Sequence, residues 1–357
     1  MSTSQHTFHL ILGRHFRNRD HVTVPCPAHP TVDVAKVIKA ALSEDAGDRG
    51  DVTTLATIPA ETQAVATFTA KSDGVLAGLG VADEVLAAVD PTVEVEWRAR
   101  DGDVVVPKQV LGVMRGSARS ILVAERVMLN FMQRMSGIAT ATAAMVSALE
   151  GLPTRVLETR KTAPGLRLTD KWAVLIGGGT NHRMGLYDMI MIKDNHIAAA
   201  GGIRAAVQRA EEYIRDQGLG DSMSIEVETS TLEEVDEVVQ ILKDTRAAAA
   251  AAAAGGTDAA AAAADGAAAT PLPAPHLRRV MLDNMARRDP SKEGGVDVSL
   301  LAEATARIGD LADTEASGNV TLETIRTIAA TGVTYVSVGA LTHSVTALDI
   351  SLNIETQ

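Results

Sequence analysis

Cationic side chains gather in one stretch of this sequence, residues 157–197, although the chain as a whole carries a formal net charge of -12. These cations are Arg160, Lys161, Arg167, Lys171, His182, Arg183 and Lys193. Guanidinium forks bind planar oxyanions at two points, so the set suits carboxylates or phosphates. Because the rest of the chain is acidic, such a cluster concentrates anions locally rather than along a broad face. For any one of these residues alone, a solvated charged loop is the simpler interpretation.

The elements that would position these cations alternate along the chain from residue 153 onward. Short apolar runs are followed by polar loops and then by segments with helical spacing, which predicts βα units with parallel strands and right-handed crossovers. Strands are expected at residues 154–158, 189–192, 224–228, 278–282, 314–316 and 334–338, and helices at 203–216, 232–243, 300–308 and 322–330.

Polar or glycine residues follow each of these predicted strands. They are Arg160 and Lys161, Lys193, Glu228, Asp283 and Asn284, Ser317 to Asn319, and Gly339. In an α/β barrel, the carboxyl ends of the strands form the face on which active sites are built. Six such placements in succession predict an anion-binding active site. The last two loops contain glycine and precede helices, a pattern typical of phosphate binding.

Composition narrows the classes of protein. A chain of 357 residues, 46% of them hydrophobic, predicts two domains or one large barrel with an addition. The acidic balance argues against nucleic acid and against an anionic membrane surface. The single cysteine, Cys26, has no partner for an internal disulfide or a cysteine-based metal motif. With no apolar run of membrane-spanning length outside an alanine tract and no signal peptide, we expect a cytoplasmic protein.

The sequence before residue 139 has a different character from the βα region. Residues 93–97 alternate apolar and acidic side chains, and turns divide the neighbouring runs, which predicts an α+β domain over residues 31–138. Ser136 and Gly137 are expected to separate two helices. The α/β barrel is expected over residues 139–345, and residues 346–357 are expected to pack back on the first domain.

Two segments show no periodic apolar face. Residues 1–30 are expected to form a disordered extension. Residues 245–276 are rich in alanine and of low complexity, and we expect them to form a mobile insertion without a catalytic role. This insertion lies between a helix and the next strand, so it should leave the barrel from the face opposite the site.

Three longer motifs carry a resemblance to a known family. ETRKTAPGLR, GGGTNHRMGL and IKDNHI resemble quinolinate phosphoribosyltransferase, the decarboxylating nicotinate-nucleotide pyrophosphorylase, and the resemblance covers about residues 32–243 and 277–355. It implies an incomplete α/β barrel of the type II phosphoribosyltransferase kind with an α+β N-terminal domain. It also implies a homodimer in which the partner's N-terminal domain completes each site.

The activity that the resemblance implies is that of a pentosyltransferase, nicotinate-nucleotide diphosphorylase (carboxylating). Phosphoribosyl is transferred from phosphoribosyl pyrophosphate to quinolinate, and carbon dioxide is lost. The products are nicotinate mononucleotide and pyrophosphate, for NAD biosynthesis. Magnesium is implied as the cofactor that accompanies the donor.

The resemblance further implies roles for individual residues around quinolinate. Arg126 is implied to reach quinolinate across the dimer interface. Lys161 and Lys193 are implied to lie between the two substrates as catalytic residues. The other quinolinate contacts are implied to be Arg160, His182 and Arg183.

Around the phosphoribosyl donor, the resemblance implies a second set of roles. Glu228 and Asp283 are implied to hold the ribose hydroxyls and the associated magnesium, and to act in catalysis. Ser317, Gly318 and Gly339 are implied to form the phosphate-binding turns.

Three other interpretations stay open at this point. A phosphoribosyltransferase for nicotinate or another base would keep the fold, but a single carboxylate needs fewer arginines. A Schiff-base barrel aldolase would use Lys161 or Lys193 as its amine, and nearby cations favour such a nucleophile. A non-catalytic anion-binding protein would leave Glu228 and Asp283 without a purpose.

Overall fold

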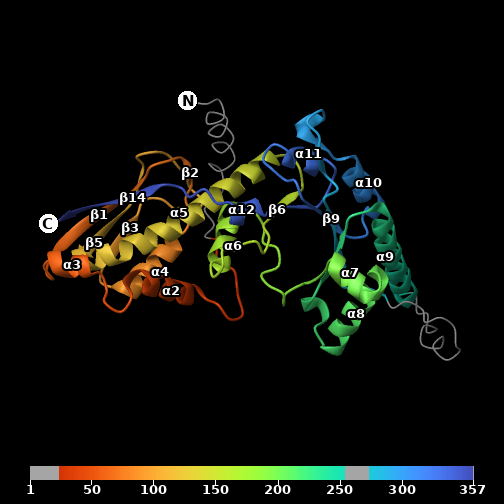
Figure 1. The fold of residues 1–357 in the computed structure, drawn as a ribbon, viewed down its shortest axis with the longest axis horizontal. Coiled ribbons are helices and arrows are strands. Elements are labelled where there is room, and N and C mark those ends of the chain that lie inside the picture. The colour runs from red at the N-terminus through yellow and green to blue at the C-terminus, as the bar shows by residue number, and fades with distance from the viewer. Residues whose placement is uncertain (1–23, 254–272, 357) are drawn as a thin grey trace. The chain divides into compact units, whose positions relative to one another are not determined.

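The computed structural model describes residues 24–253 and 273–356 of the chain. The chain divides into two compact units (Figure 1). The first unit holds the described residues up to 150 together with residues 156–182 and 339–356, and the second holds residues 151–155 and 183–338. The extension predicted for residues 1–30 lies outside the described residues up to residue 23.

A four-stranded antiparallel sheet forms one layer of the first unit, in the order β14-β1-β5-β3. Alternate residues of β1 are buried, as expected for a sheet with one face on a core. The C-terminal strand pairs with β1 from Ala70 and Ile350 to Ala64 and Thr356. The strands are β1 (Gln63–Ala70), β3 (Glu94–Trp97), β5 (Val110–Ser117) and β14 (Ile350–Thr356), and a smaller sheet pairs β2 (Gly74–Val75) with β4 (Val104–Val105).

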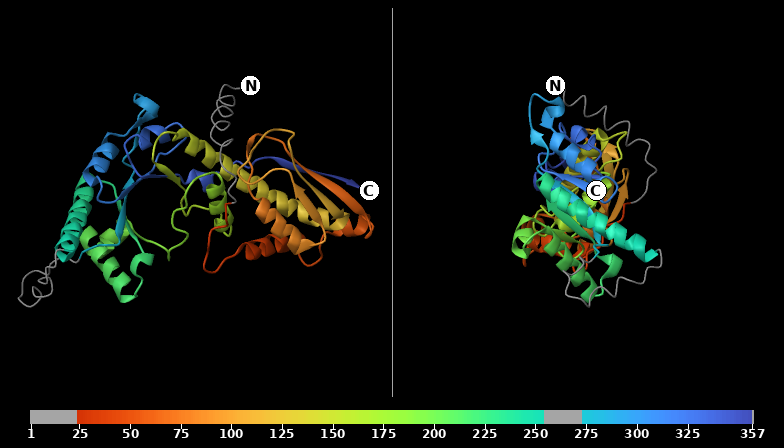
Figure 2. Two further views of the ribbon diagram at one scale, coloured as in Figure 1. Left: turned by 180° about the vertical axis from the view of Figure 1, so that it is seen from behind. Right: turned by 90° about the vertical axis from the view of Figure 1, so that its right-hand side faces the viewer.

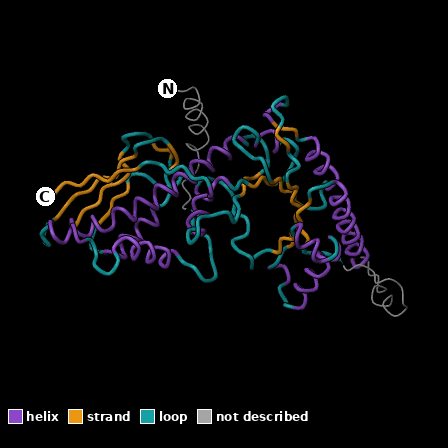
Figure 3. Tube along the Cα trace, viewed as in Figure 1, coloured by secondary structure: helices purple, strands orange, loops and turns teal. Residues whose placement is uncertain are grey.

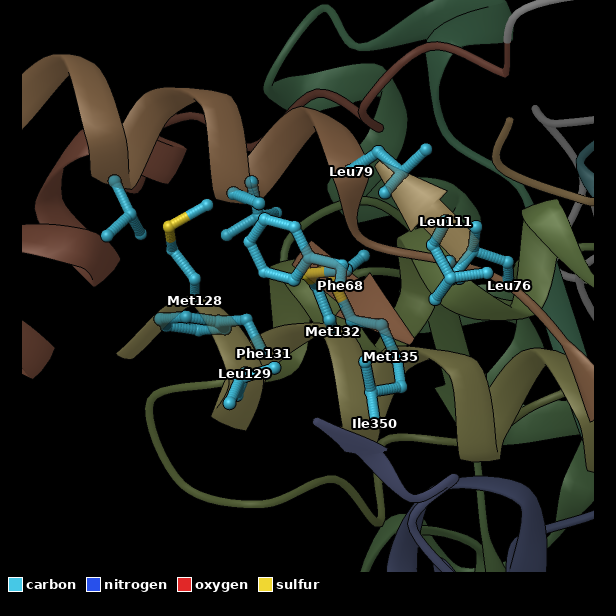
Figure 4. Close-up of a cluster of buried hydrophobic side chains, with 14 of the residues drawn as sticks. Phe68, Leu76, Leu79, Leu111, Met128, Leu129, Phe131, Met132, Met135 and Ile350 are labelled. Atoms are coloured by element: carbon cyan, nitrogen blue, oxygen red, sulfur yellow. The ribbon is translucent and has the colours of Figure 1, made fainter. Parts of the chain in front are cut away.

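One long helix, α5 (Ala118–Ala148), contacts β1, β5 and β14 of this sheet (Figure 1). Three more helices, α2 (Val34–Ala46), α3 (Val52–Thr57) and α4 (Leu79–Val89), contact α5. The core between them is built mainly from alanine, valine, leucine, isoleucine and methionine with few aromatics, and it includes Phe68 of β1, Leu111 of β5 and Met132 of α5 (Figure 4). Two further helices of this unit, α6 (Arg167–Ile176) and α12 (Ala340–His343), also contact α5 and each other.

Ser136 and Gly137 do not interrupt α5, so the predicted break is wrong. The Ser136 hydroxyl accepts a hydrogen bond from Ala77 N at 2.9 Å and donates to Ala77 O at 3.1 Å. A Cβ atom on Gly137 would overlap Thr346 O. The two small residues therefore let other backbone segments approach a continuous helix. Small residues that allow close packing cannot be distinguished, in the sequence alone, from small residues that break a helix.

The second unit is built on a parallel sheet in which β7, β8, β9, β12 and β13 lie side by side (Figure 3). A sixth strand, β6 (Arg155–Leu157), joins at the β13 edge through Arg155, whose N–H donates to Thr334 O at 3.0 Å. The other strands are β7 (Ile190–Ile192), β8 (Ile225–Thr229), β9 (Leu277–Asp283), β12 (Asp313–Ser317) and β13 (Tyr335–Ser337).

Helices connect these strands and pack on them, as the βα pattern predicts (Figure 2). They are α7 (Asp194–Ala200), α8 (Ile203–Asp216), α9 (Leu232–Ala253), α10 (Ser299–Ile308) and α11 (Ile325–Ala329), with short 3-10 turns at Gly220–Ser222 and Glu293–Gly295 and a hairpin of β10 (Arg287–Arg288) and β11 (Val296–Asp297). Among the described residues, none of the helices has the length and apolar character that crossing a membrane requires.

The alanine-rich insertion begins as helix rather than as an irregular segment. Helix α9 runs past its predicted end at residue 243 to Ala253, so residues 245–253 are helical. Alanine has the highest helix propensity, and side chains near the start of the tract add tertiary contacts. Arg246 forms a salt bridge with Asp310 at 3.2 Å, and Thr245 Oγ1 accepts from Ala274 N at 2.8 Å. The middle of the predicted insertion, residues 254–272, lies outside the described residues.

Candidate active site

The loop that carries His182 is held by a buried ion pair in the first unit. Glu158 follows β6 and pairs with Lys171 of α6, and both side chains are fully buried. Glu158 Oε1 accepts from His182 N at 3.0 Å, and Lys171 Nζ donates to His182 O at 3.0 Å. Lys171 therefore is not an available cation of the cluster, because its charge is matched by a buried carboxylate.

The loop of Arg160 and Lys161 is held by a second network in the same unit. Asp170, the neighbour of Lys171, binds Arg134 of α5 through two hydrogen bonds of 2.8 Å and accepts from Ala163 N at 3.2 Å. The hydrogen bonds that the Arg134 guanidinium donates to the Asp170 carboxylate raise the pKa of Arg134. This bidentate contact joins α5, α6 and the loop, so the backbone after Lys161 is fixed.

The side chains of this loop differ in their surroundings. Lys161 is exposed, whereas Arg160 is half-buried and its Nε has no hydrogen-bond partner among the described residues. Buried donors are almost always paired, so an unpaired guanidinium nitrogen points to a missing acceptor such as a substrate carboxylate. Gly339, at the start of α12, lies against both Lys161 and His343, since a Cβ atom there would stand 3.2 Å from each side chain.

In the second unit, Lys193 and Glu228 meet at the carboxyl ends of β7 and β8. The two strands are parallel with Ile192 beside Val227, so the next residue of each strand lies at the same level. Lys193 Nζ forms an ion pair with Glu228 Oε2. The lysine side chain is 41% exposed and the glutamate side chain 12%, so the pair is accessible to solvent at the carboxyl ends of the strands.

Asp283 and the Ser317–Gly318 turn are interlocked at the ends of β9 and β12. Asp283 and Ser317 are register partners, and Asn284 N donates to Ser317 O at 2.8 Å. Asn284 Nδ2 donates to Asp283 Oδ2 at 2.6 Å. Gly318 has φ +95°, and a Cβ atom there would overlap Asn284 Oδ1. Glycine is therefore required twice, for its backbone conformation and for space.

The turn continues through Asn319, another residue with positive φ at 57°. Its side chain donates to Ala286 O at 3.0 Å, and its carbonyl accepts from Thr324 Oγ1 at 3.0 Å. The structure thus gives the predicted phosphate turn a fixed shape.

Arg183 and Arg126 have other surroundings. Arg183 donates to Met189 O at 3.1 Å and shares an open pocket with His196 and Arg209. Arg126 is exposed on α5, where a second chain could reach it. Their roles at quinolinate stay predictions.

A layer of buried charge lies one step deeper in the second sheet, and sequence reasoning missed it. Arg279 of β9 binds Glu315 at 3.1 Å and lies 4.0 Å from Glu226, and both glutamates are fully buried. Its guanidinium stacks over Tyr335 at 4.1 Å. The glutamates precede Glu228 and Ser317 by two residues, so they point to the same face of their strands. The available signal was the acids at alternate positions, Glu226 and Glu228 in β8 and Asp313 and Glu315 in β12.

Each unit therefore brings together part of the predicted site. In the second unit, the strand ends of β7, β8, β9 and β12 hold a row of charged and hydroxyl groups with a phosphate turn: Lys193, Glu228, Asp283, Ser317 and Gly318. In the first unit, one hydrogen-bonded framework holds the residues of the cationic loops: Arg160, Lys161, His182 and Gly339.

Comparison of the chain with known proteins identifies related sequences and structures. The models of the quinolinate phosphoribosyl transferase N-terminal and C-terminal domains match residues 51–136 and 138–353. The chain is 51% identical over 338 residues to quinolinate phosphoribosyltransferase [decarboxylating] 2b, mitochondrial, of Nicotiana tabacum, which covers 95% of this chain and 87% of the relative. It is 53% identical to nicotinate-nucleotide pyrophosphorylase [carboxylating], chloroplastic, of Arabidopsis thaliana, over 93% of this chain and 85% of the relative.

Solved structures agree in fold. The crystal structure of NadC from Streptococcus pyogenes is similar with a TM-score of 0.73 and 34% identity, over 91% of this chain and 97% of that one. The predicted fold class, an incomplete α/β barrel with an α+β N-terminal domain, is confirmed. The chain belongs to the quinolinate phosphoribosyltransferase family.

Proposed function

We propose that this protein transfers phosphoribosyl from phosphoribosyl pyrophosphate to quinolinate with loss of carbon dioxide. The products are nicotinate mononucleotide and pyrophosphate, and the reaction serves the de novo synthesis of NAD. The observation that carries the proposal is the row of Lys193, Glu228, Asp283 and Ser317 along adjacent strand ends, in a chain about half identical to relatives named for this activity.

The quinolinate end of the site is assigned to the cationic loops. Quinolinate carries two neighbouring carboxylates, and Arg160, whose Nε has no hydrogen-bond partner among the described residues, is suited to bind one of them. We assign His182 and Arg183 to the same substrate, with Arg126 contributed by the partner of a homodimer. Several fixed cations match a dianion better than a nicotinate monoanion, so the full set favours quinolinate over a substrate with one carboxylate.

The donor end is assigned to the acidic residues and the phosphate turns of the second unit. Displacement at the anomeric carbon develops oxocarbenium-like charge, which the carboxylates of Glu228 and Asp283 stabilise if they hold the ribose hydroxyls. The turn at Ser317 and Gly318 offers backbone N–H groups to a phosphate. Fixed placement of both substrates supplies catalysis without a covalent nucleophile.

The same acids fit a magnesium ion that arrives with the donor. Glu228 and Asp283 end adjacent parallel strands and offer hard carboxylate oxygens, the ligands that magnesium prefers. When bound, magnesium neutralises charge on the departing pyrophosphate. The Lys193 ammonium beside Glu228 is suited to hold an anionic group of a substrate at the same place.

Decarboxylation follows from the chemistry of the ring after transfer. The new bond to the sugar makes the ring nitrogen cationic, so the adjacent carbon can keep the electron pair when the bond to carbon dioxide breaks. That carbon then takes a proton. We assign the stabilisation of the negative charge that develops there to two lysines, Lys161 and Lys193.

A Schiff-base aldolase agrees less well with the geometry. Such an enzyme needs a lysine that attacks as the free amine. Lys193 instead has its amine engaged by the Glu228 carboxylate, and Lys161 is exposed rather than enclosed in an apolar pocket. Failure of borohydride to trap a carbonyl substrate on the protein is the expected result, and trapping on either lysine would support the aldolase.

The homodimer, its exchange of Arg126 and the compartment stay proposals. Mixing an Arg126→Ala chain with an inactive Asp283→Ala chain tests the exchange. A mixed dimer has one site with both native residues, so activity should reappear on mixing two nearly inactive proteins. The sequence predicts a cytoplasmic protein, whereas relatives are named mitochondrial or chloroplastic. Imaging of a tagged chain would decide between them.

The reaction itself is tested by supplying purified protein with quinolinate, phosphoribosyl pyrophosphate and magnesium. Donor-dependent release of carbon dioxide together with nicotinate mononucleotide is the expected result. Turnover of nicotinate but not quinolinate would keep the fold and overturn the assignment of the arginines. The variant Asp283→Ala should bind quinolinate nearly as the parent does and lose turnover, because its carboxylate is assigned to the donor.

A further inference from the structure

Helix α6 carries two consecutive charged residues, Asp170 and Lys171, that are both fully shielded from solvent. Burying a charge is unfavourable unless it is paired and hydrogen-bonded, and even a paired one adds little net stability. Neither side chain is accessible to a substrate. Two such residues side by side therefore need an explanation other than binding or a simple gain in stability.

Lys171 controls the backbone of His182. Together with Glu158 it occupies both hydrogen-bonding groups of that residue, the N–H at 3.0 Å from Glu158 and the carbonyl at 3.0 Å from Lys171. These two bonds fix the peptide units on either side of the His182 Cα atom, which restricts the direction in which the His182 side chain leaves the chain. The GGGTNH loop has few side chains of its own that could provide this restriction.

Asp170 controls the backbone around Lys161 through a different route. It accepts from Ala163 N and holds Arg134, whose guanidinium also donates to Thr342 O at 3.1 Å. The Thr342 hydroxyl in turn donates to Lys161 O at 2.9 Å. The loop after β6 is thus bonded on both sides of Thr162, and each bond leads back to α6 or to its partner arginine.

We propose that Asp170 and Lys171 are positioning residues for quinolinate binding. Helix α6 fixes the positions of the two cationic loops relative to each other. The side chains of Arg160, Lys161 and His182 can then bind the same dianion. This inference rests on the proposed function, since it takes those three residues as contacts of quinolinate. The donor is assigned mainly to residues of the second unit, with only Gly339 in the first, and its binding should be affected less.

A mild test is removal of the Thr342 hydroxyl. Thr342→Val keeps the shape of a buried side chain but leaves Lys161 O without its donor. We expect the KM for quinolinate to rise several-fold, on the order of the loss of one hydrogen bond, with a smaller change in the KM for phosphoribosyl pyrophosphate. Thr342→Ser restores the hydroxyl and should rescue the quinolinate KM.

A stronger test removes the buried pair as a unit. In the double variant Glu158→Gln with Lys171→Met, the glutamine can still accept from His182 N, but the donor to His182 O is gone and no unpaired charge is left inside. We expect the KM for quinolinate to rise about ten-fold and the KM for the donor to stay within about two-fold. A role in stability alone would lower kcat through the folded fraction and leave both KM values unchanged.

His182→Ala separates failure of this inference from failure of the site assignment. If His182→Ala raises the quinolinate KM and the folded double variant does not, the positioning role is wrong. If His182→Ala changes neither KM, the assignment of His182 fails first. An equal rise of both KM values in the double variant also overturns the inference. Should that variant not fold, the comparison of Thr342→Val with Thr342→Ser decides.

Discussion

Asp101 should make the first unit less stable as pH rises from 4 to 6. Helix α4 begins after Gly78, which has no side chain to cap the helix, and the Asp101 carboxylate takes that place by accepting from Leu79 N at 3.0 Å. Burial raises the pKa of Asp101 from 3.8 to about 6, against the lowering effect of backbone bonds from Leu79, Gly78 and Gly80, and the charge of Asp83 raises it further.

The sign follows from proton binding in the two states. Between pH 3.8 and about 6, the folded chain holds a proton on Asp101 that the unfolded chain has lost. Unfolding then releases a proton, so the free energy of unfolding falls as pH rises through this window. A shift of about two units corresponds to roughly 3 kcal/mol at 1.4 kcal/mol per unit. This contribution is fully present below the lower value and lost above the upper one.

The assay compares the native chain with Asp101→Asn in urea at several pH values. Both tryptophans, Trp97 and Trp172, lie in the first unit, so intrinsic fluorescence reports its unfolding. Asparagine keeps an acceptor for Leu79 N but does not titrate. The stability of the variant relative to the native chain should therefore increase by roughly 3 kcal/mol between pH 3.5 and 6.5.

Asp83→Asn provides an independent control for the same reasoning. The substitution keeps an oxygen for the Trp97 indole N–H, which donates to Asp83 Oδ1 at 2.7 Å, and removes a charge that raises the pKa of Asp101. The pH range over which the free energy of unfolding falls because of Asp101 should then become narrower than in the native chain. A stability difference between Asp101→Asn and the native chain that is constant, or that falls with rising pH, would refute the assignment of a raised pKa.

Two glycine substitutions test the packing of the site and of α5. Gly318→Ala places a methyl group into Asn284 and strains a backbone at φ +95°, so the KM for phosphoribosyl pyrophosphate should rise more than about ten-fold. Gly332→Ala is a matched control, with φ +89° and nothing near its Cβ, and a similar kinetic loss there would contradict the phosphate role. Gly137→Ala should destabilise the first unit in urea, because its methyl group meets Thr346 O, although alanine in an open helix would stabilise by about 1 kcal/mol. A stabilised variant would show that the close approach is not tight.

The strand-end residues could be predicted from the sequence because parallel βα units repeat one local pattern. Most of the strands are short apolar runs, and each site residue lies at the carboxyl end of its strand or soon after it. Helix α8 was predicted with its observed bounds, Ile203–Asp216, since its apolar spacing is regular and glycine stands at its start. The anion-binding character of these strand ends could be predicted from residue type and order along the chain, whereas the reaction and the residue roles came from the resemblance to a family.

Which charged side chains pair with one another could not be predicted from the sequence. Lys171 was grouped with the free cations because it lies among them, yet its partner Glu158 is 13 residues away and buried. Whether a charged side chain faces solvent or a matching charge depends on how α6 packs, which local pattern does not determine. The same limit applies to Arg134, which binds Asp170 from the preceding long helix.

The contacts of the buried charges Arg279, Glu226 and Glu315 depend on the register of the sheet, which the pattern of residues does not determine. Glu226 and Glu228 lie on one face of β8, and the sequence places Glu228 at the strand end but does not say what Glu226 contacts. The pairing of β8 with β9 decides it, since Glu226 is the register partner of Arg279. Because β9 lies between β8 and β12, the same arginine also meets Glu315. Glu226 is thereby committed to a buried pair, and Glu228 remains the carboxylate that a substrate can meet.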